Sequence, residues 1–459
     1  MPCGVHDGRR LGHRCERCQR DHSKCDGSRP CLACKRKGVE CASPCTSRST
    51  LSIVQSHPPL DPRPCKPLST DRPRHYTNAF FFALGLSPTL LTVFSINAMT
   101  SMIQENKILQ DTVSLVGGFY ASRNSNLLTF SKNEKRDLVV QWHRLQKSVA
   151  LGIKEVSSDG KSDVLLACAL LLSFVQILDD TSGRSWCAWV YQLHAFVWRN
   201  GKSVAPLTPL LRSMRRLARI MNALRALCLE QDLDLALPVR SHDLGSRVDH
   251  LPPHGQDASA LFDDQLLDYF CEDLEMWAKL QWLTADWKTK SKELGLRLDP
   301  ELRKSPGRRL SEHEYQGVEL TCIASRFQRD IIASLLWYSS ENGSSVTNML
   351  LAFYHCVSVD ISLMFCDSVW LSLNCELPVM THQMSYEQAT NALQHAEKGL
   401  QSSYLEAIFY APTLYTVSMT RRYKSERSRI VSFISRLKQK GFFVADQFLS
   451  VIEEAWAAR

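Results

Sequence analysis

The chain has 459 residues, which exceeds one ordinary domain and leaves room for a small module beside a large one. Hydrophobic residues make up 44% of the sequence and charged residues 22%, close to the averages of folded proteins, which excludes disorder along the whole chain. Through His75 the sequence has 15 Lys and Arg against 7 Asp and Glu, and the remainder has 40 of each, so the formal charge of +8 lies at the start. A basic segment on a neutral body is typical of a protein whose first part meets a polyanion.

The basic segment contains six regularly spaced cysteines: Cys15, Cys18, Cys25, Cys31, Cys34 and Cys41. The unit C-x2-C-x6-C occurs twice, which predicts a site with two similar halves. Met1–Arg20 is polar and lacks the apolar core of a secretory signal, so we expect reduced thiols rather than disulfides. Zinc takes four ligands in a tetrahedron, and six thiolates hold two zinc ions if two sulfurs bridge the metals. The spacing therefore predicts a module at residues 10–45 that binds two Zn²⁺.

A single zinc ion is the alternative that the spacing leaves open. It would be held by Cys15 or Cys18 together with Cys31 and Cys34, as in a zinc ribbon. That arrangement leaves Cys25 and Cys41 without a role although their positions repeat, so the two-zinc interpretation is favoured.

Basic residues accompany the cysteines on both sides of the repeat. Cations beside a small folded module are suited to contacts with DNA phosphates. The residues expected to face DNA are Arg20, Asp21, His22, Lys24, Lys35, Arg36 and Lys37. Lys35-Arg36-Lys37 is also a basic run of the kind that directs nuclear import, so we expect the protein in the nucleus.

Residues 46–75 are rich in Ser, Thr and Pro, and proline removes backbone donors, so a linker is predicted there. Helical periodicity follows, and residues 76–459 are expected to form a large all-α domain. Asn78–Met99 is interrupted by Gly and Pro, and Val164–Leu178 is too short to span a membrane, so both are expected in the core. Val164–Leu178 is apolar all round and predicts a helix buried on every side.

Later in the chain, Leu267, Phe270, Leu274 and Trp277 recur at steps of three and four, which predicts one buried helical face. Acidic residues are interspersed through residues 261–277, and we expect them to be solvated. Pro238–Gly255 and Gly295–Leu310 are expected to be surface connections. A further helix is predicted on Ile430, Phe433, Ile434 and Leu437, with a stop at Gly441. The eight scattered cysteines from Cys168 to Cys375 are expected to be buried, inert thiols.

The segment Cys15–Cys41, with Lys24-Cys25-Asp26-Gly27, Arg29-Pro30-Cys31 and Lys37-Gly38-Val39-Glu40-Cys41, resembles the fungal zinc binuclear cluster family of transcription factors. The resemblance implies that Cys15 and Cys31 bridge the metals and that the helix after Cys18 enters the major groove to read a CGG-type triplet. Residues 76–459 are similar, more loosely, to the helical regulatory domain behind that cluster, through Leu165–Leu172 and the last residues of the chain.

Asp21 and His22 depart from the family, which carries basic residues at those two positions. An aspartate repels phosphate and accepts only from cytosine N4 in the major groove, while histidine gains charge as the pH falls through about 6.5. We therefore expect modest DNA affinity, with relaxed or altered triplet preference and tighter binding near pH 6 than near pH 8.

These features predict a sequence-specific regulator of RNA polymerase II transcription, and not an enzyme, since no P-loop, G-x-S-x-G elbow or H-E-x-x-H motif is found. The expected partners are double-stranded DNA and transcriptional co-regulators, with no membrane and with a homodimer left open. The alternative is a zinc-stabilised protein-interaction factor with weakened DNA reading.

Overall fold

The computed structural model describes residue 18 and residues 31–39, 72–87, 90, 94, 96–124, 128–155, 162–200, 209–228, 260–294, 310–339, 345–420 and 424–457. The chain divides into two compact units, Met1–Cys65 and Lys66–Arg459. The described residues are mainly helical and contain no β-strand, which confirms the all-α expectation for them.

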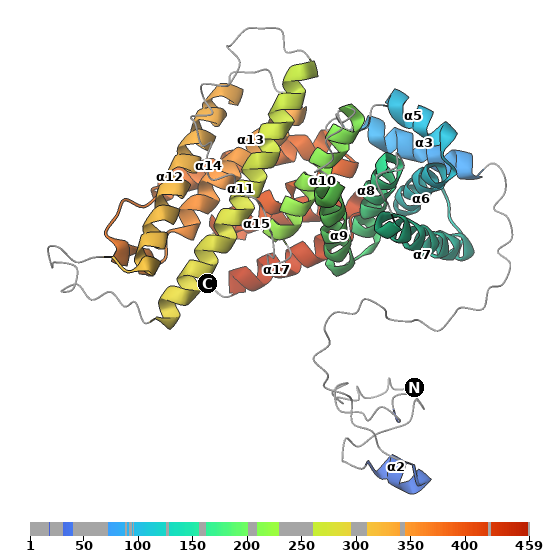
Figure 1. Cartoon of the computed structure of the whole chain (residues 1–459), viewed down its shortest axis with the longest axis horizontal. Coiled ribbons are helices and arrows are strands. Elements are labelled where there is room, and N and C mark those ends of the chain that lie inside the picture. The colour runs from blue at the N-terminus through green and yellow to red at the C-terminus, as the bar shows by residue number, and fades with distance from the viewer. Residues whose placement is uncertain are drawn as a thin grey trace. The chain divides into compact units, whose positions relative to one another are not determined.

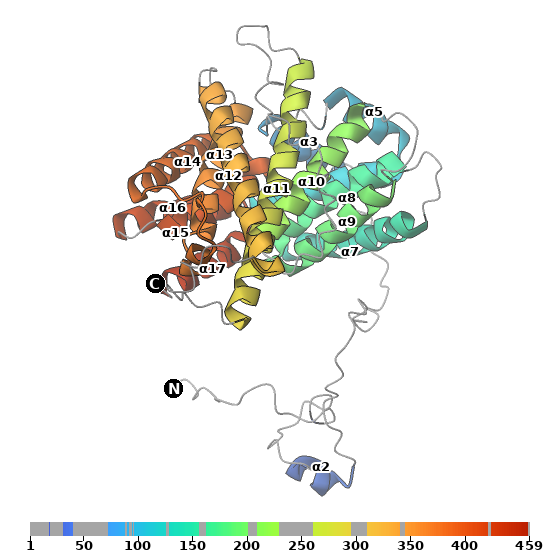
Figure 2. The ribbon, with the colours of Figure 1, turned by 60° about the vertical axis from the view of Figure 1, so that its left-hand side comes forward.

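The second unit is an assembly of helices that pack mostly on their neighbours in sequence. Its first helices are α3 (Arg72–Gly85), α5 (Ile96–Glu105), α6 (Lys107–Arg123), α7 (Lys132–Glu155), α8 (Ser162–Asp179), α9 (Arg184–Asn200) and α10 (Pro209–Cys228). They are followed by α11 (Ala260–Glu293), α12 (Glu312–Ser339), α13 (Ser345–Met364), η4 (Ser368–Leu373), α14 (His382–Ser402), η5 (Leu405–Tyr410), α15 (Ala411–Thr420), α16 (Lys424–Gln439) and α17 (Ala445–Ala457). The long helix α11 lies between α10 and α12 (Figures 1 and 2).

Helix α8 is the central helix that the apolar run predicts. Every residue from Leu166 to Leu178 is buried, because α6, α7, α9 and α10 all pack against α8. The prediction of a helix buried on every side is confirmed.

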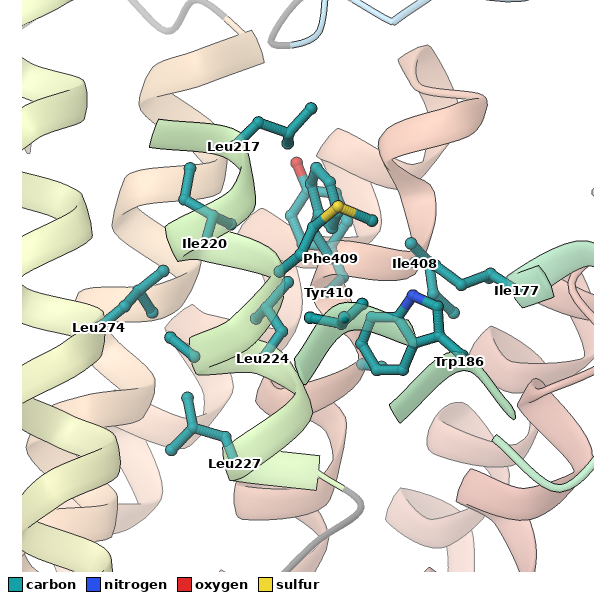
Figure 3. Close-up of a cluster of buried hydrophobic side chains, with 14 of the residues drawn as sticks. Ile177, Trp186, Leu217, Ile220, Leu224, Leu227, Leu274, Ile408, Phe409 and Tyr410 are labelled. Carbon is teal, nitrogen blue, oxygen red and sulfur yellow. The ribbon is translucent and has the colours of Figure 1, made fainter. Parts of the chain in front are cut away.

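The core where α8, α9, α10, α11 and η5 meet is built from large aliphatic and aromatic side chains (Figure 3). Leu217, Ile220 and Leu224 lie along one side of α10, and η5 contributes Phe409 and Tyr410. Leu274 of α11 belongs to the same cluster, and its periodic partners Leu267, Phe270 and Trp277 are also buried, as predicted. This junction ties the early helices of the unit to the late ones.

The end of α16 follows its sequence signal. Ile430, Phe433, Ile434 and Leu437 are all buried, and the helix ends at Gln439. Gly441 has φ +96°, and the Phe442 amide donates to the Leu437 carbonyl at 3.2 Å, as in a Schellman motif. The predicted stop is confirmed.

The acidic residues of α11 are not all solvated, so that expectation was wrong for part of them. Arg216 of α10 donates twice to Asp268, at 2.5 and 2.6 Å, and Arg219 donates twice to Glu275, at 2.7 Å each. Asp273 is buried and accepts from the Tyr354 hydroxyl at 3.1 Å. Fork-shaped guanidinium pairs of this kind fix the register of α10 against α11.

The start of the helical unit differs from the predicted boundary, and two predicted connections lie almost entirely outside the described residues. Helix α3 begins at Arg72, ahead of the expected domain start at residue 76, and its first turn accommodates Pro73 because that position needs no intrahelical N–H donor. The connections expected at Pro238–Gly255 and Gly295–Leu310 lie outside the described residues, apart from Leu310.

The described residues of Asn78–Met99 are buried in part, and Val164–Leu178 is interior from Leu166 onward, while Phe82 of the first segment is exposed. Phe80, Leu84, Leu90 and Phe94 of the first segment are buried. Among the described residues, none of the helices combines the length and the apolar character that crossing a membrane requires.

The scattered cysteines are buried in part. Burial raises the pKa of Cys168, Cys187 and Cys271 to about 12, so these thiols stay protonated at neutral pH. Cys322 and Cys366 are exposed, so the expectation of burial was wrong for these two. Cys322 lies on α12 and Cys366 follows the end of α13, while Cys228 and Cys375 are half-buried.

Two stacked histidines between α13 and α14 make the fold sensitive to acid. The rings of His355 and His395 lie 5.7 Å apart, and His395 Nδ1 lies 2.9 Å from Asn348 Oδ1. Desolvation, assisted by His355 and Lys398, lowers the pKa of His395 from 6.5 to about 4. Since the unfolded chain binds this proton more readily, the stabilisation is complete above about pH 6.5 and is lost as the pH falls toward 4.

We expect His395→Gln to reduce the loss of stability between pH 7 and pH 5. The measurement is the urea midpoint of the full chain at both pH values. His382→Gln is the matched control, because His382 is exposed on the same helix. If the urea midpoint falls by the same amount from pH 7 to pH 5 in wild type and in His395→Gln, His395 is not the source of the acid sensitivity.

Candidate metal centre

Helix α2 (Leu32–Lys37) positions two of the predicted ligands in the first unit. Cys31 is its N-cap with an extended backbone, and the Cys34 amide donates to the Cys31 sulfur at 3.4 Å. Gly38 ends the helix at φ +62°, and Val39 N–H donates to the Cys34 carbonyl at 3.2 Å. A backbone N–H aimed at a sulfur stabilises negative charge on it, which favours the thiolate that a metal requires.

The sulfur of Cys18 converges with those of Cys31 and Cys34, which lie 13 and 16 residues further along the chain. Cys18 Sγ lies 3.5 Å from Cys31 Sγ and 3.9 Å from Cys34 Sγ, and all three sulfurs lie within 4.8 Å of one another. A disulfide would require about 2.05 Å. Sulfurs about 2.3 Å from a tetrahedral zinc are separated by about 3.8 Å, which the two measured distances match. The donor set and its spacing therefore fit a zinc ion.

The burial of these three thiols also favours a bound metal. Cys18, Cys31 and Cys34 are 2%, 0% and 1% exposed, and the only side chains packed against them in the described part of this unit are Ala33 and Val39. So small an apolar cluster cannot offset the conformational entropy of folding. A metal bound by the sulfurs would supply the missing stabilisation.

The described sulfurs account for half of the predicted ligands. Cys15, Cys25 and Cys41 lie outside the described residues, as do Arg20, Asp21, His22 and Lys24. The three described sulfurs are spaced as ligands of one common metal. A second metal would require sulfurs from the other three cysteines.

Lys35, Arg36 and Lys37 are exposed in the last turn of α2, next to the buried Cys34. Cations at a helix C-terminus are favoured by its partial negative charge. The three positive side chains thus lie beside the candidate metal site and face solvent, where a polyanion can reach them.

A cavity of about 240 Å³ between α11 and α12 is a feature that the sequence did not indicate. It is lined by Leu283, Asp286, Trp287, Lys290, His313, Gln316, Glu319, Leu320 and Ile323. His313 Nε2 lies 2.7 Å from Ser291 Oγ, and its ring stacks on Trp287 with centroids 5.0 Å apart. Ser291 is fully buried and donates to the Trp287 carbonyl at 2.7 Å. A hydroxyl held in this way is a structural link between the helices and is poorly placed for attack on a substrate.

Gly317 explains why Trp287 fits there. A Cβ on Gly317 would lie 2.6 Å from the Trp287 ring, so only glycine leaves room for the indole. Trp287 then stacks on Trp370 with centroids 4.1 Å apart and donates to the His313 carbonyl at 2.8 Å.

Comparison of the chain with known protein families, with curated proteins and with solved structures found no match.

Proposed function

We propose that this protein is a sequence-specific DNA-binding regulator of RNA polymerase II transcription, which acts in the nucleus through a module of residues 10–45 held by two zinc ions. The observation that carries the proposal is the convergence of Cys18, Cys31 and Cys34 beside the exposed cations Lys35, Arg36 and Lys37. The twofold C-x2-C-x6-C spacing, and the resemblance to the fungal zinc binuclear cluster family, support six thiolate ligands.

Cys18, Cys31 and Cys34 would hold the metal, whose binding would contribute the free energy that folds the module, and the protein's own cations would supply the affinity for DNA. Each phosphate contact releases counterions from DNA, so the basic start of the chain gives binding that weakens as salt rises. Lys35, Arg36 and Lys37 would fix the position of the module on the backbone, and residues of the run from Arg20 to Lys24 would reach base edges.

The helical unit has a different proposed role. Its residues from 76 onward carry equal numbers of acidic and basic side chains. The proposed linker ends before Arg72, where α3 begins. We assign it a regulatory, non-catalytic role that involves transcriptional co-regulators, in line with its resemblance to fungal regulatory domains.

A second candidate function is a zinc-stabilised protein-interaction factor. It is favoured by Asp21 and His22, which replace two cations in the run expected to read DNA. The two candidates share the metal site and differ in whether any DNA sequence is selected.

The test is selection of duplexes from a randomised pool by the zinc-loaded full chain. We expect enrichment of a short GC-containing site, because one module makes few base contacts. Absence of any enriched sequence would favour the interaction factor over the DNA reader.

The double substitution Asp21→Lys/His22→Lys is expected to tighten DNA binding by about tenfold and to steepen the dependence of log K on log salt by up to about one unit per added phosphate contact. It should also remove the preference for pH 6 over pH 8, because lysine keeps its charge across that range. Fluorescence anisotropy across salt and pH measures both effects. Arg9→Lys/Arg10→Lys is the control, because it leaves the charge unchanged. If Asp21→Lys/His22→Lys binds DNA as wild type does, residues 21 and 22 do not contact DNA.

A further inference from the structure

Helix α7 carries a basic stripe on the face that points away from the core. Leu138, Trp142, Leu145 and Val149 are buried on one side of the helix. At about 100° per residue, the opposite side is centred on six side chains spaced by three or four residues. This stripe consists of Arg136, Val140, Arg144, Lys147, Leu151 and Lys154, all exposed.

The stripe is positive over its whole length. Four of its six side chains are cationic, and the acidic neighbours Asp137 and Glu155 lie on one edge of the exposed face, with His143 on the other. From Arg136 to Lys154 the helix rises by about 27 Å. The residues of the chain from 76 onward are neutral overall, so this concentration of charge is local.

Within the part of the chain that the structure describes, Arg136, Arg144, Lys147 and Lys154 make no ion pair.

Helix α16 is also rich in cations, and several of them contact neighbouring side chains. Arg429 contacts Glu397 at 2.8 Å, Lys438 contacts Asp446 at 2.8 Å, and Arg427 lies 4.9 Å above the Trp456 ring. Cations of α16 thus contact groups of neighbouring helices, whereas the four cations of α7 face solvent along a single stripe.

The apolar members of the stripe indicate what that partner is. Val140 and Leu151 are 41% and 47% exposed, each between two cations of the stripe. A DNA backbone offers phosphates but little apolar surface, whereas an acidic protein segment with interspersed apolar side chains matches both kinds of residue.

We propose that the α7 stripe is a docking surface for an acidic, apolar-containing segment of a partner protein. The carboxylates of the segment contact Arg144, Lys147 and their neighbours, and its apolar side chains cover Val140 and Leu151. The surface lies in the helical unit and acts whether or not the metal module reads DNA.

The test uses the full chain and a synthetic fluorescent peptide of about 20 residues, roughly enough for a helix as long as the stripe, that mixes Asp and Glu with Leu and Phe. We expect binding that weakens with salt. Arg144→Glu/Lys147→Glu should weaken it by about tenfold, because exposed ion pairs are individually modest. Val140→Ser/Leu151→Ser should also weaken binding, and a peptide with Ser in place of Leu and Phe should bind less tightly.

Arg326→Glu/Arg329→Glu on α12 is the matched control, because it makes the same charge change at two exposed positions of another helix. It should leave peptide binding unchanged. Equal weakening by the α12 and α7 variants would overturn the proposal, as would peptide binding that a zinc chelator abolishes. If Arg144→Glu/Lys147→Glu weakens binding of duplex DNA and not of the peptide, DNA is the occupant and the proposal fails.

Discussion

Replacing Cys34 by serine is expected to reduce affinity for the selected DNA site by about a thousandfold, to the level of non-specific binding. The Cys34 sulfur lies 3.9 Å from that of Cys18 and is 1% exposed, so its loss removes one buried ligand from the candidate zinc site. Structural zinc contributes on the order of 10 kcal/mol to the folding of small modules, and no comparable apolar core is present among the described residues of this unit. The module should therefore unfold, and α2 with it.

The measurement is anisotropy of a labelled duplex at fixed salt with the full chain. Cys322→Ser is the matched control, since this thiol is exposed on α12 and should tolerate the change. Wild-type DNA affinity in Cys34→Ser would show that the sulfur is no ligand of a structural metal.

Gly117→Ala is expected to destabilise the helical unit by about 3 kcal/mol, at the upper end of ordinary overpacking effects. Helices α3 and α6 pack closely, and a Cβ on Gly117 would lie 1.8 Å from the Tyr76 carbonyl oxygen and 2.9 Å from the Phe80 nitrogen. Both atoms are backbone, so the helices must separate to admit the methyl group. The gain in helix propensity from alanine is at most about 1 kcal/mol and does not offset this separation.

Gly85→Ala tests whether the packing, and not the residue type, causes the effect. Gly85 ends α3, and nothing lies within 4 Å of its added Cβ, so we expect a change within about 0.5 kcal/mol. Urea unfolding followed by circular dichroism measures both variants. A loss in Gly117→Ala no larger than in Gly85→Ala would contradict the close approach of α3 to α6.

The sequence predicts those parts of the fold in which a short residue pattern by itself determines burial or the end of a helix. The apolar run of α8 has no polar face to turn to water, so it is buried whatever its neighbours are. Gly441 marks the end of α16 because a positive φ is readily available to glycine.

The parts that sequence did not predict depend on which helices meet. Asp268 and Glu275 have the pattern of a solvated face until α10 brings Arg216 and Arg219 against them. The stripe on α7 was not predicted from the sequence. Its cations and apolar residues recur at steps of three and four, but they are recognised as one exposed face only once Leu138, Trp142, Leu145 and Val149 are seen to be buried.

The sequence predicted which kind of residue forms the candidate metal site, but not the distances between those residues. The cysteine spacing identifies thiolate ligands, and Cys18, Cys31 and Cys34 do converge. The nearness of Cys18 to Cys34 did not follow from spacing alone, because the path of the chain between them decides it. The number of metals depends on Cys15, Cys25 and Cys41 and stays a prediction.

The central claim, a DNA-reading module built on a two-zinc cluster, is tested most directly by native mass spectrometry of the full chain prepared with zinc. The account predicts two zinc ions per chain, because six thiolates with two bridging sulfurs satisfy two tetrahedra. Both ions should be lost to a strong chelator together with DNA binding. A single bound zinc ion would indicate the ribbon arrangement through Cys31 and Cys34, and a chain that binds no zinc would contradict the account.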